Sequence, residues 1–162
     1  MVNLGSFIRF HATRTPDRLA VVYRDQRITY RDLLDRVEQL SAWLAEQGVG
    51  PEAVVACFMK NSAAFLGLVF AASHIGAIFL PINYRLSRDE VGYIVGNAGA
   101  RILIADLELA AIGSGSVPVV LLDETAQSSI THLAPDAAPA PLVYRGPRDL
   151  MRLIGDCGDE YR

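Results

Sequence analysis

The sequence predicts an α/β layered domain in which a mostly parallel sheet is flanked by helices. Short apolar runs of strand length alternate along the chain with longer segments of helical periodicity. One run, residues 54–59, is apolar without interruption, which is typical of a parallel strand covered by helices on both faces. This alternation predicts right-handed crossover connections between parallel strands.

An amphipathic helix and a strand pair are predicted at the start of the chain. The apolar positions that share one face of this helix are Leu4, Phe7, Ile8 and Ala12. The helix is expected to end at Thr15-Pro16, because proline lacks the N–H that a helix needs. Residues 19–23 then predict a strand, residues 24–27 a tight polar turn, and Ile28 the start of the returning strand.

The second helix carries clear signals at both of its ends. Thr29 and Asp32 have the spacing of a capping box, in which each side chain satisfies a backbone N–H of the other residue. Gly48 is suited to end the helix in a left-handed turn. The apolar stripe between them consists of Leu33, Val37, Leu40 and Leu44.

Beyond Gly50-Pro51, strands and helices alternate. The predicted elements are a strand at 54–59, a helix at 62–76, a strand at 78–82, a helix at 87–98, a strand at 101–105, a short helical piece near 106–112 and a strand at 117–122. Ser87 and Glu90 form a second capping box, and Gly99 a second helix stop. Residues 123–147 are rich in Ala, Pro, Ser and Asp and are interpreted as an extended surface connection.

The uncharged stretch Ala63–Ile82 is long enough for a transmembrane helix. A buried helix followed by a buried strand explains it better. Ser62 can cap a helix, Gly76 can end it, and residues 78–82 are strand-like and contain a proline. We therefore expect no membrane partner.

Composition restricts the function classes further. About half of the residues are hydrophobic, which favours a folded core. The net charge is −3 and basic residues are spread along the chain, which argues against nucleic acid as a partner. The start shows no signal peptide, and Cys57 and Cys157 have no disulfide or zinc spacing, so we expect a cytoplasmic protein.

For each candidate site residue, a structural role is preferred to a catalytic or binding role. Residues 113–116 (Gly-Ser-Gly-Ser) resemble a phosphate cradle, but Val117-Pro118 follows instead of a helix, which favours a loop. Histidine and cysteine are assigned no chemistry. His74 is expected in the core, Cys57 is expected to be a buried apolar residue, and His11 and His132 have no Ser, Cys or carboxylate constellation near them in sequence. Cys157 lies beside Asp156 and Asp159, whose charges would raise its pKa, which argues against a reactive thiol. The carboxylates interpreted as the solvated face of one helix are Asp32, Asp35, Glu38 and Glu46. No catalytic, cofactor-binding or metal-binding residue is assigned.

Several segments in order resemble the start of AMP-forming acyl-CoA synthetases, in the adenylate-forming superfamily. The matching stretches are residues 10–22, 28–33, 60–62, 72–83 with the following 84–90, and 97–104. The form of residues 80–86 (Leu-Pro-Ile-Asn-Tyr-Arg-Leu) looks closest to fatty-acid or other carboxylic-acid–CoA ligases. The resemblance implies ATP-dependent formation of an acyl-adenylate and then of an acyl-CoA, with Mg²⁺ and CoA as further requirements of the intact family.

The same resemblance implies that family elements are missing. Residues 148–154 look like the strand that leads into the family's phosphate-binding loop, but a non-matching tail, residues 155–162, follows. Within that tail, residues 155–158 (Gly-Asp-Cys-Gly) resemble a distant ribose-binding stretch, although an unrelated tail explains them more simply. The expected domains are therefore residues 1–122, 123–147, 148–154 and 155–162.

Three functional hypotheses follow. The first is a truncated ligase, inactive as this chain alone and binding no cofactor by itself. The second is one half of a split ligase that a complementary C-terminal fragment completes. The third is an interaction or membrane-associated module, which could self-associate through an exposed apolar surface.

Overall fold

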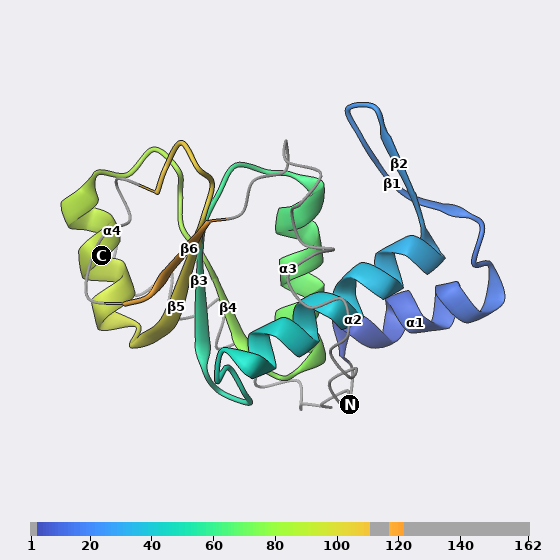
Figure 1. Ribbon diagram of the computed structural model, residues 1–162, viewed down its shortest axis with the longest axis horizontal. Helices are drawn as coiled ribbons and strands as arrows, with labels where there is room; N and C mark the ends of the chain where they lie inside the picture. The colour runs from blue at the N-terminus through green and yellow to red at the C-terminus, as the bar shows by residue number, and fades with distance from the viewer. Residues whose placement is uncertain (1–2, 111–116, 122–162) are drawn as a thin grey trace, which may run out of the picture.

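The computed structural model describes residues 3–110 and 117–121. Its helices are α1 (Leu4–Arg14), α2 (Tyr30–Glu46), α3 (Ala63–His74) and α4 (Arg88–Asn97). Its strands are β1 (Leu19–Tyr23), β2 (Gln26–Thr29), β3 (Val54–Phe58), β4 (Ile78–Pro81), β5 (Ala100–Ala105) and β6 (Val119–Leu121). β1 and β2 form an antiparallel hairpin that projects at one end, while the other four strands form a sheet in the order β4-β3-β5-β6 (Figure 1).

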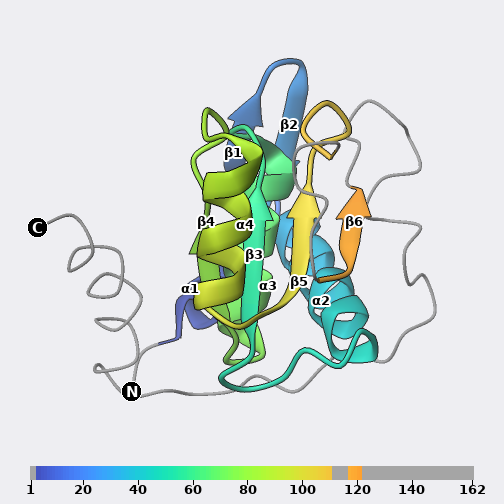
Figure 2. The same ribbon diagram turned by 90° about the vertical axis from the view of Figure 1, so that its left-hand side faces the viewer.

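All strand pairs in the four-stranded sheet are parallel, and helices flank both of its faces. In Figures 1 and 2, α2 and α3 lie on one side of the sheet and α4 lies on the other. This is the predicted fold class. The interpretation of residues 63–82 is also confirmed, because the stretch forms α3 and β4, and no helix among the described residues is long and apolar enough to cross a membrane.

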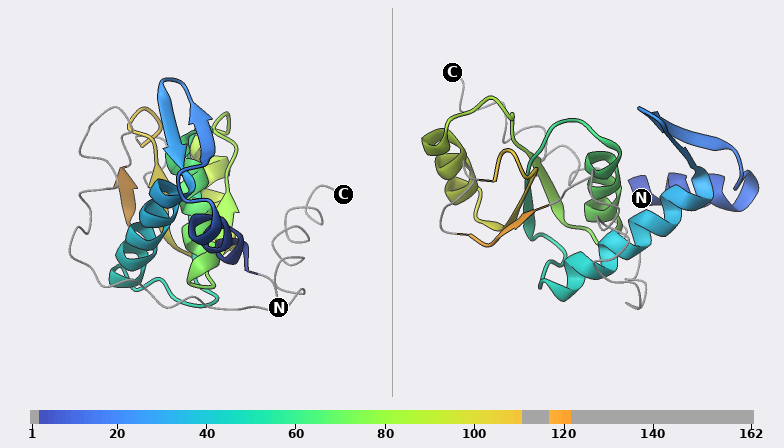
Figure 3. Two further views of the ribbon diagram at one scale, coloured as in Figure 1. Left: turned by 90° about the vertical axis from the view of Figure 1, so that its right-hand side faces the viewer. Right: turned by 45° about the horizontal axis from the view of Figure 1, so that its top comes forward.

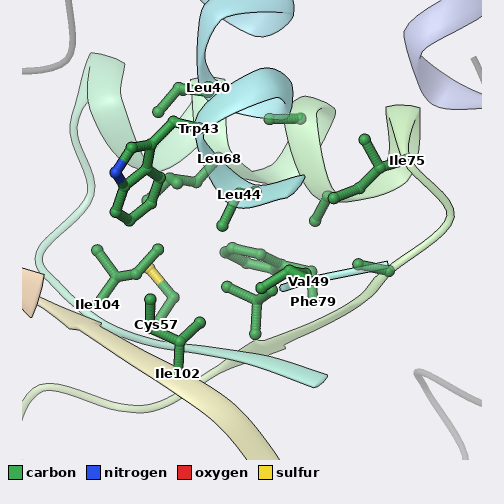
Figure 4. Packing of buried hydrophobic residues seen from close by; sticks show 14 of the residues in the cluster. Leu40, Trp43, Leu44, Val49, Cys57, Leu68, Ile75, Phe79, Ile102 and Ile104 are labelled. Carbon is green, nitrogen blue, oxygen red and sulfur yellow. The ribbon is translucent and has the colours of Figure 1, made fainter. Parts of the chain in front are cut away.

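The centre of the structure is β3. Residues 55–58 of this strand are each 0% exposed. Because side chains alternate along a strand, Val55 and Cys57 pack toward α2 and α3, whereas Ala56 and Phe58 pack toward α4. Figure 4 shows the first of these cores, with Trp43 and Leu44 of α2 above Cys57 and the β5 side chains.

The predicted helix ends are present. Thr29 with Asp32, and Ser87 with Glu90, form the two capping boxes. The helix stops have left-handed backbone, with φ of 75° at Gly48 and 60° at Gly99. At Gly48 an added Cβ would also lie 3.0 Å from the guanidinium of Arg101, so both backbone and space favour glycine there.

The start of the chain is tied to the end of α3. The Asn3 amide nitrogen donates to the carbonyl of Ser73 at 2.6 Å, and the backbone N–H of Leu4 donates to the Ser73 hydroxyl at 3.2 Å. The Asn3 side chain also caps α1 by accepting from the backbone N–H of Gly5 at 2.7 Å. These bonds set the position of α1 against α3, beside α2 (Figure 3).

Three sequence predictions were wrong in detail. Phe7 is 52% exposed, because α1 buries Gly5 and Ile8, and Phe7 points to the opposite side of the helix. Residues 107–110 form turns instead of a helical piece, with the Leu109 N–H bonded to the Asp106 carbonyl three residues earlier. β2 begins at Gln26, which shortens the predicted turn to Arg24 and Asp25.

Other predicted boundaries differ by one or two residues. The start of β6 is one of them: the strand begins at Val119, after Pro118, instead of at Val117. Leu122, the loop at 113–116, and the segments 123–147, 148–154 and 155–162 lie outside the described residues.

Replacing Gly96 by Ala should stabilise the chain by about 1 kcal/mol. Gly96 lies within α4, where glycine costs about that much relative to alanine, and an added Cβ would meet nothing within 4 Å. Urea unfolding followed by circular dichroism measures the change. The matched control is Gly99→Ala, which should destabilise because the φ of Gly99 is 60°. A lower stability for Gly96→Ala would contradict the geometry of α4.

Asp32 should make the chain more stable at neutral pH than at acid pH. Hydrogen bonds from the Thr29 hydroxyl and backbone lower the pKa of this carboxyl below its usual value. The ionised form is therefore favoured by folding, so its contribution is present above the unfolded-state pKa and is lost as the pH falls through the lowered value. We expect Asp32→Asn to lower the urea midpoint at pH 7 but to have little effect near about pH 2.

Asp35→Asn provides the control for this pH series. Asp35 is exposed on the same helix and lies outside the capping box. Equal effects of the two substitutions at pH 7 would show that Asp32 contributes only through helix charge and not through the cap.

Candidate functional site

The sheet topology points to one edge of the molecule. From β3 the chain passes through α3 to β4 on one side, and it then returns through α4 to β5 on the other side of β3. In open α/β sheets, ligands bind at the carboxyl ends of the strands where the strand order reverses in this way. The segments just beyond the carboxyl ends of β3 and β5 therefore form the candidate site.

Lys60 joins the ends of these two strands. Its backbone N–H donates to the carboxylate of Asp106 at 2.8 Å, and its Nζ donates to the carboxylate of Glu108 at 2.5 Å. The hydrogen bond with Glu108, and then its charge, raise the pKa of Lys60 above its usual value. The same contacts lower the pKa of Glu108. Both side chains are exposed, so solvent screens the pair.

The segment after β4 brings further polar groups to this edge. The Asn83 side chain accepts a hydrogen bond from the backbone N–H of Arg85 at 3.1 Å, which shapes the turn into α4. The guanidinium of Arg85 lies 5.6 Å from the ring centroid of Tyr84. After the two effects of Glu108, the charge of Asp106 also raises the pKa of Lys60, so the ends of β3 and β5 influence one another.

The chemistry of this edge is electrostatic. It brings together one ammonium group, one guanidinium, two carboxylates and a phenol, and the ammonium group is already paired with Glu108. Among residues 3–110 and 117–121, no three His, Cys, Asp or Glu side chains gather to hold a metal ion. The edge can position a neighbouring segment or bind a charged group, but its residues do not form a nucleophile–base pair.

The other residues weighed from the sequence have structural surroundings. Cys57 and His74 are each 0% exposed, and burial raises the pKa of the Cys57 thiol. The ring of His11 stacks on Tyr30 at a centroid distance of 4.7 Å. Glu38 pairs with Arg9 at 3.1 Å. His132, Cys157 and the loop at 113–116 lie outside the described residues.

A shallow open groove also runs along the outer side of α1. Its lining residues are Ser6, Arg9, Phe10, Thr13 and Arg14. The guanidinium of Arg14 lies over the ring of Phe10, 5.2 Å from its centroid. The groove thus combines apolar and basic character.

Comparison with known families identifies the fold. The family model described as AMP-binding enzyme matches residues 8–151. The chain belongs to this family. AMP-binding enzymes are the adenylate-forming superfamily that the segment resemblance indicated, so that part of the prediction is confirmed.

Solved and curated AMP-binding enzymes are similar over most of this chain. The N-terminal domain of FACL13 from Mycobacterium tuberculosis is 28% identical with a TM-score of 0.78, covering 92% of this chain and 40% of that domain. The 2-succinylbenzoate–CoA ligase of Geobacillus sp. (strain WCH70) is 34% identical over 122 residues, which are 75% of this chain and 25% of the ligase.

Peptide synthetases of the same family are also similar. Gramicidin S synthase 2 of Brevibacillus brevis is 29% identical over 133 residues, which are 81% of this chain and 3% of the synthase. The chain thus spans only a small part of the length of the curated relatives that it matches. Membership in the AMP-binding family does not by itself select a CoA ligase over an amino-acid-activating domain.

Sequence reasoning assigned no role to Asp106 and Glu108. Asp106 directly follows the apolar run of β5, so a polar residue at the carboxyl end of a parallel strand was the available signal. Its partner could not be found in this way, because Lys60 lies 46 residues earlier and meets Asp106 only through the pairing of β3 with β5.

Asp106→Ala should lower the stability of the chain by about 1 kcal/mol, because the backbone N–H of Lys60 loses a charged acceptor. Glu108→Gln should change stability less, since its partner is a solvated side chain that hydrates freely. Urea unfolding of both variants at one pH measures which substitution lowers the stability more. A larger loss for Glu108→Gln would show that the side-chain pair, not the backbone bond, joins β3 to β5.

Proposed function

We propose that this chain supplies the α/β part that carries the first parallel sheet of an AMP-forming carboxylic-acid–CoA ligase of the fatty-acid type. The observation that carries the proposal is the family match over residues 8–151. The parallel sheet and its crossover helices lie within this matched range. The intact ligase would use ATP, Mg²⁺ and CoA, and it would act in the cytoplasm without nucleic acid or membrane as a partner.

One observation supports a CoA ligase over an amino-acid-activating domain. Identity does not separate the two, since it is 34% to the CoA ligase of Geobacillus and 33% to the probable peptide synthetase CymA of Salinispora arenicola. Residues 80–86, which look closest to acid–CoA ligases in sequence, form the end of β4 and the turn to α4 that carries Asn83, Tyr84 and Arg85. This ligase-like stretch therefore lies at the polar edge of the sheet.

The chain alone should not form an acyl-adenylate. Adenylation depends on several groups that neutralise the phosphates of ATP at the same time. At the polar edge the ammonium group of Lys60 is engaged by Glu108, and the chain spans 25% of the CoA ligase that it matches. The function proposed for this chain is therefore structural support of a site whose other groups come from the rest of an AMP-binding domain.

Isotope exchange between ATP and pyrophosphate tests the proposal. We expect the pure chain to give the same rate as a blank without protein, for fatty acids, aromatic acids and amino acids. In a chimera, the 122-residue segment of the Geobacillus ligase that this chain matches is replaced by the corresponding segment of this chain. This chimera should give exchange with the acid that the Geobacillus ligase uses. Exchange by the pure chain would overturn the requirement for a second fragment.

A buried variant controls for misassembly of the chimera. Leu103→Asp places a charge at a position that is 0% exposed in β5, so it should abolish exchange by unfolding the sheet. Val22→Asp, at 58% exposure on the β1–β2 hairpin and away from the polar edge, should leave exchange unchanged.

A further inference from the structure

Two neighbouring helices at one end of the molecule carry opposite charges. α1 and α2 lie side by side, and α1 is at the end opposite α4 (Figure 1). α1 contains Arg9 and Arg14 and no carboxylate. α2 contains two arginines and four carboxylates, of which Asp35 and Glu46 are exposed without taking part in the helix cap. A positive helix thus borders a negative one.

Side-chain contacts show that the two charged stripes share one surface. The guanidinium of Arg9 donates to the carboxylate of Glu38 at 3.1 Å, which joins the outer sides of the two helices. Arg9 also lines the open groove on α1 with Phe10 and Arg14, so this groove borders α2. Asp35 lies one turn before Glu38 and therefore on the same side of α2. We refer to the surface formed by these five residues as the α1–α2 face.

The α1–α2 face has charges that nothing in the described part of the chain neutralises. Neither Arg14 nor Asp35 has an ion-pair partner among the described residues. Phe10 lies beneath the guanidinium of Arg14 and is 52% exposed, and Phe7 on the same helix is equally exposed. A complementary partner must therefore offer a carboxylate to α1, a cation to α2 and apolar surface to Phe10.

A second copy of this chain meets all three requirements. Turned by a two-fold axis over the seam between α1 and α2, it places its α2 on α1 and its α1 on α2. Asp35 of each copy then faces Arg14 of the other, so the same contact forms twice, as an isologous interface requires. A partner with charge of a single sign would leave one of the two helices facing like charge.

We propose that two copies of this chain associate through the α1–α2 face in a two-fold dimer. The Arg14–Asp35 pairs form on both sides of the axis, and Phe10 packs on α2 of the other copy. The inference does not rest on the proposed ligase function, because it uses only the charges and the exposure of this face. Failure of one therefore leaves the other standing.

The size of the face sets the expected strength of the dimer. α1 has 11 residues and α2 has 17. At about 1.5 Å per residue and about 10 Å of width, the two helices present on the order of 400 Å² per copy. The dimer then buries on the order of 800 Å², which is less than the roughly 1,200 Å² at which stable interfaces begin. The dimer should be weak and reversible.

Sedimentation velocity of the full chain, from about 10 to about 500 µM, tests the inference. We expect a monomer–dimer equilibrium that shifts toward monomer when the salt concentration is raised from about 0.05 to about 1 M, because salt screens exposed ion pairs. Phe10→Ala should raise the dissociation constant about tenfold, as for a central aromatic contact residue. The matched control is Tyr93→Ala on α4, where Tyr93 is 63% exposed and the dissociation constant should change less than about twofold.

Exchanging the charges tests the two-fold arrangement itself. Arg14→Glu or Asp35→Arg alone should weaken the dimer about fivefold or more, because each places like charges together at both symmetric contacts. An equimolar mixture of the two variants should dimerise as the unaltered chain does, since both contacts of the mixed dimer again join opposite charges. The chain with both substitutions should also recover the dimer. Equal urea midpoints of the variants and the unaltered chain would exclude unfolding as the cause.

Each other outcome overturns the inference. A chain that stays monomeric up to about 500 µM has no such interface. Species that grow beyond the dimer indicate head-to-tail or apolar aggregation instead of a closed two-fold pair. A dimer that Tyr93→Ala weakens but Phe10→Ala does not is formed through α4. A dimer that the charge exchanges leave unchanged, or that the mixture does not restore, does not use the Arg14–Asp35 contact.

Discussion

The burial of β3 between two helical layers is the constraint on which the structure depends. Each residue from Val55 to Phe58 is fully buried, and the strand pairs in parallel with β4 on one side and β5 on the other. Parallel neighbours require crossover connections, and α3 and α4 provide them on opposite faces. The same arrangement brings Lys60, Asn83 and Asp106 to one edge of the sheet, because each residue follows the carboxyl end of its strand.

Local chemistry explains why much of the fold was predictable. The capping boxes of Thr29 with Asp32 and of Ser87 with Glu90 form within four residues, and the sequence contains both partners. Gly48 and Gly99 end helices because their backbone is left-handed, which is also a local property. The uninterrupted apolar run at 54–59 indicated that helices cover both faces of β3, although it did not indicate which helices.

The features that sequence reasoning missed all depend on tertiary contacts. Phe7 has the spacing of a core residue, but Gly5 and Ile8 decide which side of α1 is buried, and they do so by packing on α2 and α3. Lys60 and Glu108 are separated by 48 residues and meet through strand pairing. The candidate site was therefore not visible as a motif, since its members share a sheet edge and not a segment of sequence.

The pairing of Lys60 with Glu108 also determines which ligands the polar edge of the sheet can bind. An anion that approaches Lys60 must compete with Glu108, which already accepts a hydrogen bond from the ammonium group, and Asp106 adds a second negative charge nearby. This local charge balance disfavours phosphate binding at Lys60 itself. The edge is better suited to hold the turn after β5 against the end of β3. The two backbone bonds, from Lys60 N–H to the Asp106 carboxylate and from Asp106 N–H to the Phe58 carbonyl, fix these two strand ends relative to each other.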